Sequence, residues 1–359
     1  MSGIIQDARL LPEVLQGDIR IYGLQNKQFT NRFFVVTGPG SRELLRSPEV
    51  IGFPCYSALL EETAAALRYL FPNGPGGGLD ILTILRGGLN YPLEEACARV
   101  GIRVRDMHFV SCERIIRDHA ILGLDIKYEK LSPSADRILA IGDIIASGAT
   151  MQMCLDYVVK EFKRQGGSIR RIVFFTIGGT RAIELMEEMT PHIRSLFPGF
   201  EGFDCFFYEG VFTVYDGPGE SGINVRDIDF GWKGGAVAPE FRSYVLDTPD
   251  SLLEKCIIYD GGARRYEIQL HLEEVSEYWE GILSRASVID PVALVGEKLG
   301  YPAPLDFPAW QEVTHIVETG WEGLWEKEQE LLRRAPDLDL ASIARRRLEA
   351  VEALKQLYI

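Results

Sequence analysis

The sequence predicts an α/β protein with a parallel-sheet core, followed by a mostly helical C-terminal segment. Between about residues 80 and 195, short runs that are apolar throughout alternate with stretches of helical periodicity. Strands of this kind are buried on both faces, which is typical of parallel sheets covered by helices. Beyond residue 261 the apolar residues recur at helical spacing instead. The length of 359 residues corresponds to roughly two domains.

The strands and helices of the core follow one another in regular order. Glycines at 74 and 76–78 mark a loop just before the first strand. Four apolar runs are predicted as strands, namely residues 81–85, 104–110, 137–141 and 172–177. Helical periodicity follows three of them, over residues 93–100, 151–162 and 183–186. We therefore place an α/β domain at residues 1–215, a loop-rich connection at 216–260 and a helical segment at 261–359.

The C-terminal helices carry clear apolar stripes. One stripe consists of Ile268, Leu272, Val275, Trp279 and Ile282, and a second consists of Ala344, Leu348, Val351, Leu354 and Tyr358. Such stripes usually pack against a core, so packing is the favoured interpretation and an oligomer contact is the alternative. The glycine-rich stretches at 217–222 and 231–235 lack the spacing of a nucleotide P-loop and are interpreted as connections.

Charge and composition exclude several classes of protein. The chain has 38 Lys and Arg against 52 Asp and Glu, a net charge of −14, and no long basic run. We therefore expect neither nucleic acid nor an anionic membrane surface as a partner. No apolar run approaches the roughly 20 residues that span a bilayer, and the N-terminus lacks the pattern of a secretion signal. Six cysteines without a CxxC pair indicate reduced thiols in a cytoplasmic protein.

Residues 138–151 form the strongest chemical motif in the chain. An apolar run leads into Asp143 and then into a loop of small residues that opens a helix. Small residues let backbone N–H groups approach an anion, Ser147 and Thr150 add hydroxyl donors, and the helix N-terminus adds its positive dipole. The pattern predicts a phosphate site with Asp143 available to sugar hydroxyls. Taken alone, Asp143 is also compatible with a loop or helix-capping carboxylate.

This stretch resembles the phosphoribosyl pyrophosphate motif of type I phosphoribosyltransferases. The resemblance implies that the sugar 5′-phosphate is bound by Ala146, Ser147, Gly148, Ala149 and Thr150. It also implies that the loop of Arg86, Gly87 and Gly88 binds the pyrophosphate. Asp143 would contact the ribose, with Mg²⁺ bridging substrate oxygens close by. Glycines in such a turn are equally compatible with a simple need for positive φ.

The charged stretch 112–127 lies where this family keeps a flexible hood loop. Arg114, Arg117 and His119 are candidate hood residues, and the candidate catalytic residues are Arg86, Asp143 and Lys127. The alternative interpretation of these charges is a solvated face. Residues 177–181 either border the acceptor pocket or form a plain turn with a helix cap. The aromatic residues near 208–212 either close over a base or, as favoured, lie in a core strand.

Two departures from the family pattern bear on function. Gly142 stands where the family usually has a second acidic residue, and Ala146 stands where enzymes specific for 6-oxopurines place an aspartate. The expected function is transfer of phosphoribose from phosphoribosyl pyrophosphate to an unidentified small-molecule nitrogen acceptor, with 6-oxopurines disfavoured and with Mg²⁺ as cofactor. The alternative is a non-catalytic sensor of phosphoribosyl pyrophosphate or a nucleotide. The resemblance also allows a homodimer and an acceptor other than a nucleobase.

Overall fold

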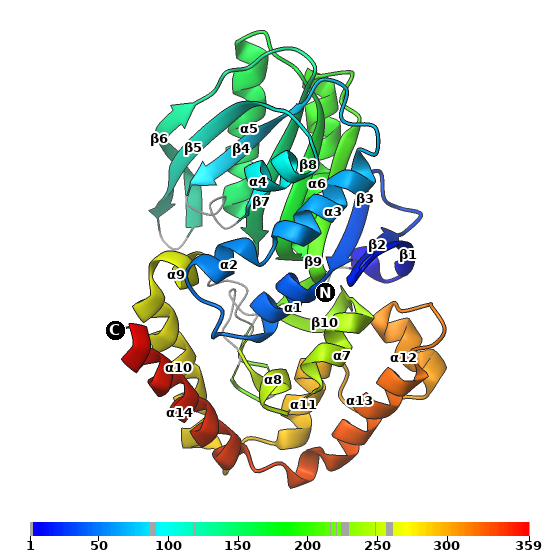
Figure 1. Cartoon of the computed structure of the whole chain (residues 1–359), viewed down its shortest axis with the longest axis vertical. Helices are drawn as coiled ribbons and strands as arrows, with labels where there is room; N and C mark the ends of the chain where they lie inside the picture. The colour runs from blue at the N-terminus through cyan, green and yellow to red at the C-terminus, as the bar shows by residue number, and fades with distance from the viewer. Residues whose placement is uncertain are drawn as a thin grey trace.

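A computed structural model describes residues 3–85, 91–117, 120–215, 217–219, 221–223, 230–247, 249–255 and 261–358. Its centre is one large sheet with helices on both faces and further helices below its edge (Figure 1). The strands in the described part are β1 (Arg9–Gln16), β2 (Ile19–Gln25), β3 (Arg32–Thr37), β4 (Leu79–Leu85), β5 (Val104–Arg117), β6 (Ala120–Lys130), β7 (Arg137–Ile145), β8 (Ile169–Gly179), β9 (Gly202–Val214) and β10 (Phe230–Val237).

The sheet is mixed, which corrects the expectation of a parallel sheet. Its order is β1-β2-β3-β9-β8-β7-β4-β5-β6, and β10 pairs with β9. The strands from β3 to β5 in this order run parallel to one another, whereas β1, β2, β6 and β10 pair antiparallel with their neighbours. β1 and β2, and likewise β5 and β6, are joined by short connections, which can link only antiparallel strands.

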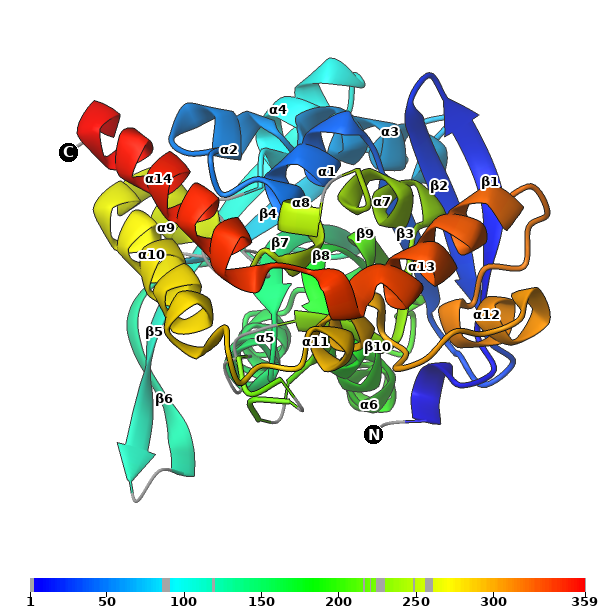
Figure 2. The same cartoon turned by 90° about the horizontal axis from the view of Figure 1, so that it is seen from below.

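Helices cover both faces of the sheet. They are α1 (Pro39–Arg46), α2 (Phe53–Ser57), α3 (Leu60–Leu70), α4 (Leu93–Arg99), α5 (Ala149–Arg164), α6 (Thr180–Leu196), α7 (Pro239–Val245), α8 (Pro249–Leu253), α9 (Gly261–Tyr266), α10 (Ile268–Arg285), α11 (Pro291–Leu299), α12 (Phe307–Thr314), α13 (Glu322–Arg334) and α14 (Leu340–Tyr358). α3 and α4 lie on one face, and α5 and α6 lie on the other (Figures 1 and 2). The predicted alternation of strands and helices between residues 80 and 195 is therefore confirmed.

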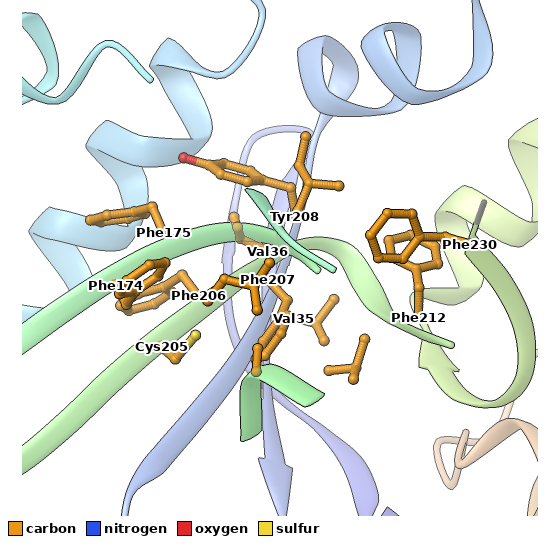
Figure 3. Close-up of a cluster of buried hydrophobic side chains, with 14 of the residues drawn as sticks. Val35, Val36, Phe174, Phe175, Cys205, Phe206, Phe207, Tyr208, Phe212 and Phe230 are labelled. Atoms are coloured by element: carbon orange, nitrogen blue, oxygen red, sulfur yellow. The ribbon is translucent and has the colours of Figure 1, made fainter. Parts of the chain in front are cut away.

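Aromatic side chains fill the core where β3, β8 and β9 lie together. Phe206 stacks on Phe34 with ring centroids 4.8 Å apart. Its ring also stacks on Phe175 with centroids 5.4 Å apart (Figure 3). Tyr208 is fully buried, and its hydroxyl lies 2.6 Å from the hydroxyl of Thr63. The aromatic stretch near 208–212 therefore lies in a core strand, as the favoured interpretation predicts.

The region expected as a connection contains regular elements. β10, α7 and α8 all fall within residues 216–260. The glycine-rich stretch 231–235, interpreted from sequence as a loop, lies inside β10, which corrects that prediction. Its glycines allow close approach to β9, because a Cβ at Gly235 would lie 2.3 Å from the carbonyl oxygen of Val211. Backbone proximity therefore explains a composition that otherwise indicates a turn.

The C-terminal helices form an arc below the carboxyl ends of the parallel strands (Figure 1). α10 and α14 pack side by side along most of their length (Figures 1 and 2). Leu272, Val275, Trp279 and Ile282 are fully buried there, which confirms packing as the role of the first stripe. No helix in the part of the chain that the structure describes has the length and apolar character needed to cross a membrane.

Candidate functional site

The strand order reverses direction between β4 and β7. The chain leaves β4 through α4 and reaches β5 on one side, whereas it leaves β7 through α5 and reaches β8 on the other. Ligands of open α/β sheets bind outside the carboxyl ends of the strands at such a reversal. The loop after β4 holds Arg86, Gly87 and Gly88, and these predicted pyrophosphate ligands lie outside the described residues.

The loop after β7 brings the predicted phosphate ligands to this reversal. Gly148 has a φ of +74°, a left-handed conformation that a glycine adopts at no steric cost, and its carbonyl oxygen accepts from the Gln152 N–H at 2.8 Å. α5 then runs for 16 residues with no acidic side chain in its first turn. The first N–H groups of a helix have no partner within it and attract anions. Ser147 is exposed beside them, so the site is open to a ligand.

Asp143 lies near the end of β7 and is half-buried. Its Oδ1 accepts a hydrogen bond from the backbone N–H of Ile144 at 2.8 Å. Burial raises the pKa of this carboxyl from an ordinary value of 3.8 to about 7, and the Ile144 N–H opposes that shift. The carboxyl is therefore poised to change charge near neutral pH.

Tyr91 covers the backbone of Gly142 and is a site residue that sequence reasoning missed. A Cβ at Gly142 would lie 2.5 Å from Cβ of Tyr91 and 2.6 Å from its Cγ. The buried Tyr91 hydroxyl accepts from the Ile177 N–H at 3.0 Å, so the ring bridges from β7 to β8. The side chain that the family places at 142 therefore has no room here. No sequence pattern marks Tyr91, because the contact joins residues far apart in the chain.

The described residues of the stretch predicted as a hood loop lie in the outer part of the β5–β6 hairpin, which projects from the body of the molecule (Figure 2). The two strands pair antiparallel with two shifts of register. Lys127 is the extra residue at a bulge, and its Nζ lies 2.5 Å from Asp125 and 3.2 Å from Glu113. Hydrogen bonds to these carboxylates raise the pKa of Lys127. Lys127 therefore keeps its positive charge and shares it with two carboxylates on the hairpin.

The remaining hood candidates have no described side chains. Arg114 and Arg117 are residues of β5, for which only the backbone is described, and His119 lies outside the described residues. At the end of β8, Arg181 pairs with Glu184 at 3.1 Å and Glu188 at 2.9 Å on its own helix. Residues 177–179 end β8 and α6 begins directly at Thr180 without a side-chain cap, so the predicted turn with a helix cap is not found.

Magnesium would find few protein ligands at this site. Within the described ranges, no group of three or more His, Cys, Asp or Glu side chains is arranged to hold a metal ion. Asp143 offers one hard oxygen ligand, which suits an ion that keeps water and substrate oxygens in its shell. The residues present therefore fit Mg²⁺ that arrives with a phosphorylated ligand.

Comparisons with known proteins give only weak similarity. No family model and no curated protein matches the chain. Among solved structures, a protein of Aquifex aeolicus is 15% identical with a TM-score of 0.34, covering 51% of this chain and 90% of its own. Hypoxanthine phosphoribosyltransferase of Staphylococcus aureus is 14% identical with a TM-score of 0.28, covering 36% and 65%. Purine phosphoribosyltransferase of Pyrococcus horikoshii is 17% identical with a TM-score of 0.24, covering 33% and 71%. Similarity at these scores carries no inference about function.

Proposed function

We propose that this chain binds phosphoribosyl pyrophosphate at the reversal between β4 and β7 and transfers its phosphoribosyl group to a nitrogen nucleophile. One observation carries the proposal. A buried strand ends near a carboxylate and leads, through a left-handed glycine, into the N-terminus of a long helix without acidic residues in its first turn. A sugar 5′-phosphate fits that combination, because the amides bind the anion and the carboxylate accepts from sugar hydroxyls.

The 5′-phosphate would lie against residues 146–150. Small side chains at Ala146 and Ala149 leave the backbone N–H groups accessible, and the Ser147 hydroxyl is exposed beside them. The helix dipole adds attraction for the negative charge. Rigid binding of this group fixes the sugar for reaction.

Asp143 would accept a hydrogen bond from a ribose hydroxyl. The ionised carboxylate accepts a stronger hydrogen bond than the neutral carboxyl does. Because the pKa of Asp143 is about 7, the strength of this interaction depends on pH near neutrality. Mg²⁺ bound with the substrate would neutralise charge on the departing pyrophosphate, with Asp143 as its candidate protein ligand.

The reaction breaks the bond from C1 to the pyrophosphate oxygen, and the electron pair leaves with pyrophosphate. The nucleophile's lone pair forms the new C1–N bond, and a proton is released from the nitrogen. Because the sugar carries positive charge in the transition state, positioning and electrostatics supply the catalysis. Arg86 and a hairpin cation among Arg114, Arg117, His119 and Lys127 are the proposed stabilisers of the leaving group.

Lys127 has to exchange its present partners before it can serve that role. Its Nζ is held by Asp125 and Glu113 on the hairpin itself. A pyrophosphate carries more negative charge than either carboxylate, so exchange is feasible when the hairpin closes. The acceptor is proposed by its chemical class alone, as a nitrogen nucleophile. The neutral side chain of Ala146 disfavours 6-oxopurines.

The variant Ala149→Asp tests the phosphate site. A carboxylate at the first position of α5 repels the 5′-phosphate while favouring the helix dipole, so the protein should fold and lose binding of phosphoribosyl pyrophosphate. Ala341→Asp, at the second position of α14, is the matched control because it adds the same charge to another helix start. Calorimetric titration measures the affinity of both variants. Equal affinities would mean that the 5′-phosphate does not bind at the start of α5.

A non-catalytic sensor is the second candidate, and two observations favour it. Tyr91 fills the space that an acidic side chain at 142 would need. The positive charge of Lys127 is paired with a carboxylate of the hairpin itself. Pyrophosphate release over a panel of nitrogen acceptors separates the two functions. Release with any acceptor supports the enzyme, whereas tight binding without release supports the sensor. Restoring an acid by Gly142→Glu alone is uninformative, because the new side chain displaces Tyr91.

A further inference from the structure

Two cysteines from different elements meet beside the candidate site. Sγ of Cys112 on β5 lies 2.9 Å from Sγ of Cys154 on α5, and both are free thiols. The residues are 42 positions apart, so their proximity follows from the fold and not from a local motif. Cys112 is half-buried and Cys154 is fully buried.

The pair connects the β5–β6 hairpin with the helix that follows the predicted phosphate loop. Ser111 pairs with Leu85, the last residue of β4, so Cys112 stands at the carboxyl edge where the hairpin begins to project. Cys154 lies in the second turn of α5, directly after the predicted phosphate loop. Tyr157 on the same helix donates a hydrogen bond to Glu129 on β6, which adds a second contact between helix and hairpin.

We infer that Cys112 and Cys154 form a reversible disulfide that cross-links the β5–β6 hairpin to α5 and thereby lowers ligand affinity. A disulfide has an S–S bond of about 2.05 Å, so the two sulfur atoms have to approach by about 0.9 Å, within reach of small side-chain rotations. The effect on affinity rests on the proposed function, whereas the formation of the bond does not.

The oxidation balances with a disulfide oxidant such as oxidised glutathione. The more accessible Cys112 thiolate attacks one glutathione sulfur, which forms a mixed disulfide and releases one glutathione thiolate. Cys154 then loses its proton to solvent and attacks Sγ of Cys112, which forms the internal disulfide and releases the second glutathione. The protein loses two electrons and two protons, and oxidised glutathione becomes two reduced molecules.

Burial sets the order of these two steps. Desolvation raises the pKa of the Cys154 thiol, and the nearby charge of Asp143 raises it further. The thiolate is the attacking species, so Cys154 acts second, where intramolecular contact compensates for a low thiolate fraction.

Mass spectrometry of the full-length protein tests the bond. The protein is incubated with oxidised glutathione, its remaining thiols are alkylated after denaturation, and the peptides are mapped. We expect two of the six thiols to be protected, a mass loss of about 2 Da from the two hydrogens removed, and a cross-linked peptide pair containing Cys112 and Cys154. Full alkylation, glutathione retained on Cys112, or a different pair would overturn the inference.

Two variants make the result specific. Cys154→Ala should stop at the mixed disulfide on Cys112, because the resolving thiol is gone. Cys97→Ala, which removes another buried thiol, should still form the cross-link. Loss of the cross-link in Cys97→Ala, or a cross-link to Cys112 in Cys154→Ala, would overturn the specific pairing.

Titration with phosphoribosyl pyrophosphate and Mg²⁺ tests the functional effect. The oxidised protein should bind at least tenfold more weakly than the reduced protein, since the cross-link holds the hairpin in its present place, and dithiothreitol should restore affinity. Cys112→Ala, which removes the attacking thiol and so carries neither glutathione nor the cross-link at this place, should show no such loss. Equal affinities would overturn the effect on the site. Absence of binding to the reduced protein would contradict the proposed function, while the peptide map still decides the disulfide.

Discussion

Gly142 and Asp143 are neighbours on β7, but the first position has to lack a side chain whereas the second offers a carboxyl group. Successive side chains of a strand point to opposite faces, so position 142 faces the Tyr91 ring while Asp143 faces α5. Position 142 has no space for a side chain, whereas Asp143 carries a carboxyl whose pKa of about 7 reflects burial. This strand end therefore offers one ionisable group to a ligand.

Asp143→Asn should weaken binding of phosphoribosyl pyrophosphate. A charge-assisted hydrogen bond contributes about 1.5–3 kcal/mol, so the dissociation constant should rise about tenfold or more. The wild-type affinity should also increase from pH 6 to pH 8, because Asp143 ionises through pH 7. The variant should show only the titration of the ligand itself. Calorimetric titrations at both pH values that give parallel curves for the two proteins would remove Asp143 from the site.

The same carboxyl should make the free energy of unfolding depend on pH. A pKa raised in the folded state means that the folded protein binds more protons than the unfolded chain between about pH 4 and 7, so stability contributed by this group falls as pH rises through that window. Asp143→Asn should remove this dependence and be more stable than the wild type by about 1 kcal/mol or more at pH 8. Urea unfolding at pH 4 and pH 8 measures it. A wild type that gains stability relative to the variant at pH 8 contradicts the burial of Asp143.

Gly142→Ala should destabilise the fold. Its Cβ would meet Cβ of Tyr91 at 2.5 Å, and overpacking of this kind costs about 1–3 kcal/mol. Gly123→Ala on β6 is the matched control, since its nearest neighbour, Cδ1 of Ile115, lies 3.9 Å away. Urea midpoints provide the comparison, and equal midpoints for the two variants would mean that Tyr91 does not occupy this space.

At the scale of elements, α5 has a left-handed glycine at each end. Gly148 precedes its first residue with φ of +74°, and Gly166 follows its last turn with φ of +78°. A Cβ at either position meets no atom closer than 3.5 Å, so the strain of substitution is that of backbone conformation alone.

Gly148→Ala and Gly166→Ala should therefore separate stability from binding. Each should lose about 1–2 kcal/mol of stability, the cost of a left-handed residue with a Cβ. Only Gly148→Ala should also lose affinity for phosphoribosyl pyrophosphate, because the loop that presents the amides is distorted at that end alone. Thermal melts measure the stability of both variants, and calorimetric titrations measure their affinity for phosphoribosyl pyrophosphate. Equal affinities would mean that the loop at Gly148 does not bind the ligand.

The apolar strands were predictable because they are buried on both faces, and the helices between them were predictable because their buried residues recur at helical spacing. The outer part of the β5–β6 hairpin was not, because its many charges indicate a solvated loop, whereas pairing between the two strands makes it a hairpin. Gly231 and Gly235 indicate a turn by composition, yet they serve close packing of β10 on β9. Tertiary contacts override local preference at both places.

The candidate site follows the same division. Residues 146–150 form a contiguous motif whose placement at a helix start was predictable from sequence. Tyr91 over Gly142 and Cys112 beside Cys154 are contacts between distant parts of the chain, so no local pattern reveals them. Lys127 is recognisable as a cation, but its neutralisation depends on the register of the hairpin.

At the scale of the whole molecule, buried ion pairs tie the C-terminal helices to the core. Arg242 on α7 binds both carboxylate oxygens of Glu328 on α13, at 2.9 and 3.0 Å. Tyr301 and Trp310 donate to the same carboxylate at 2.5 and 2.8 Å, so the buried charge is well hydrogen-bonded. The apolar residues of both parts also form one continuous cluster.

The chain should therefore unfold as one cooperative unit. Glu328→Ala leaves the buried Arg242 without its carboxylate and should cost about 3–5 kcal/mol. Glu330→Ala, which removes an exposed carboxylate from the same helix, should cost at most about 1 kcal/mol. Far-ultraviolet circular dichroism reports the whole chain, and four of its five tryptophans lie in the C-terminal segment. Both signals should shift together in urea, and an earlier fluorescence transition would make the helices an independent domain.

The most direct test of the central claim is a calorimetric titration of the reduced wild-type protein with phosphoribosyl pyrophosphate, with and without Mg²⁺. The geometry of β7, the loop after it and α5 predicts binding with one ligand per chain and micromolar affinity that depends on Mg²⁺. Absence of binding under both conditions would contradict the proposed function and leave the motif as an element of the fold alone.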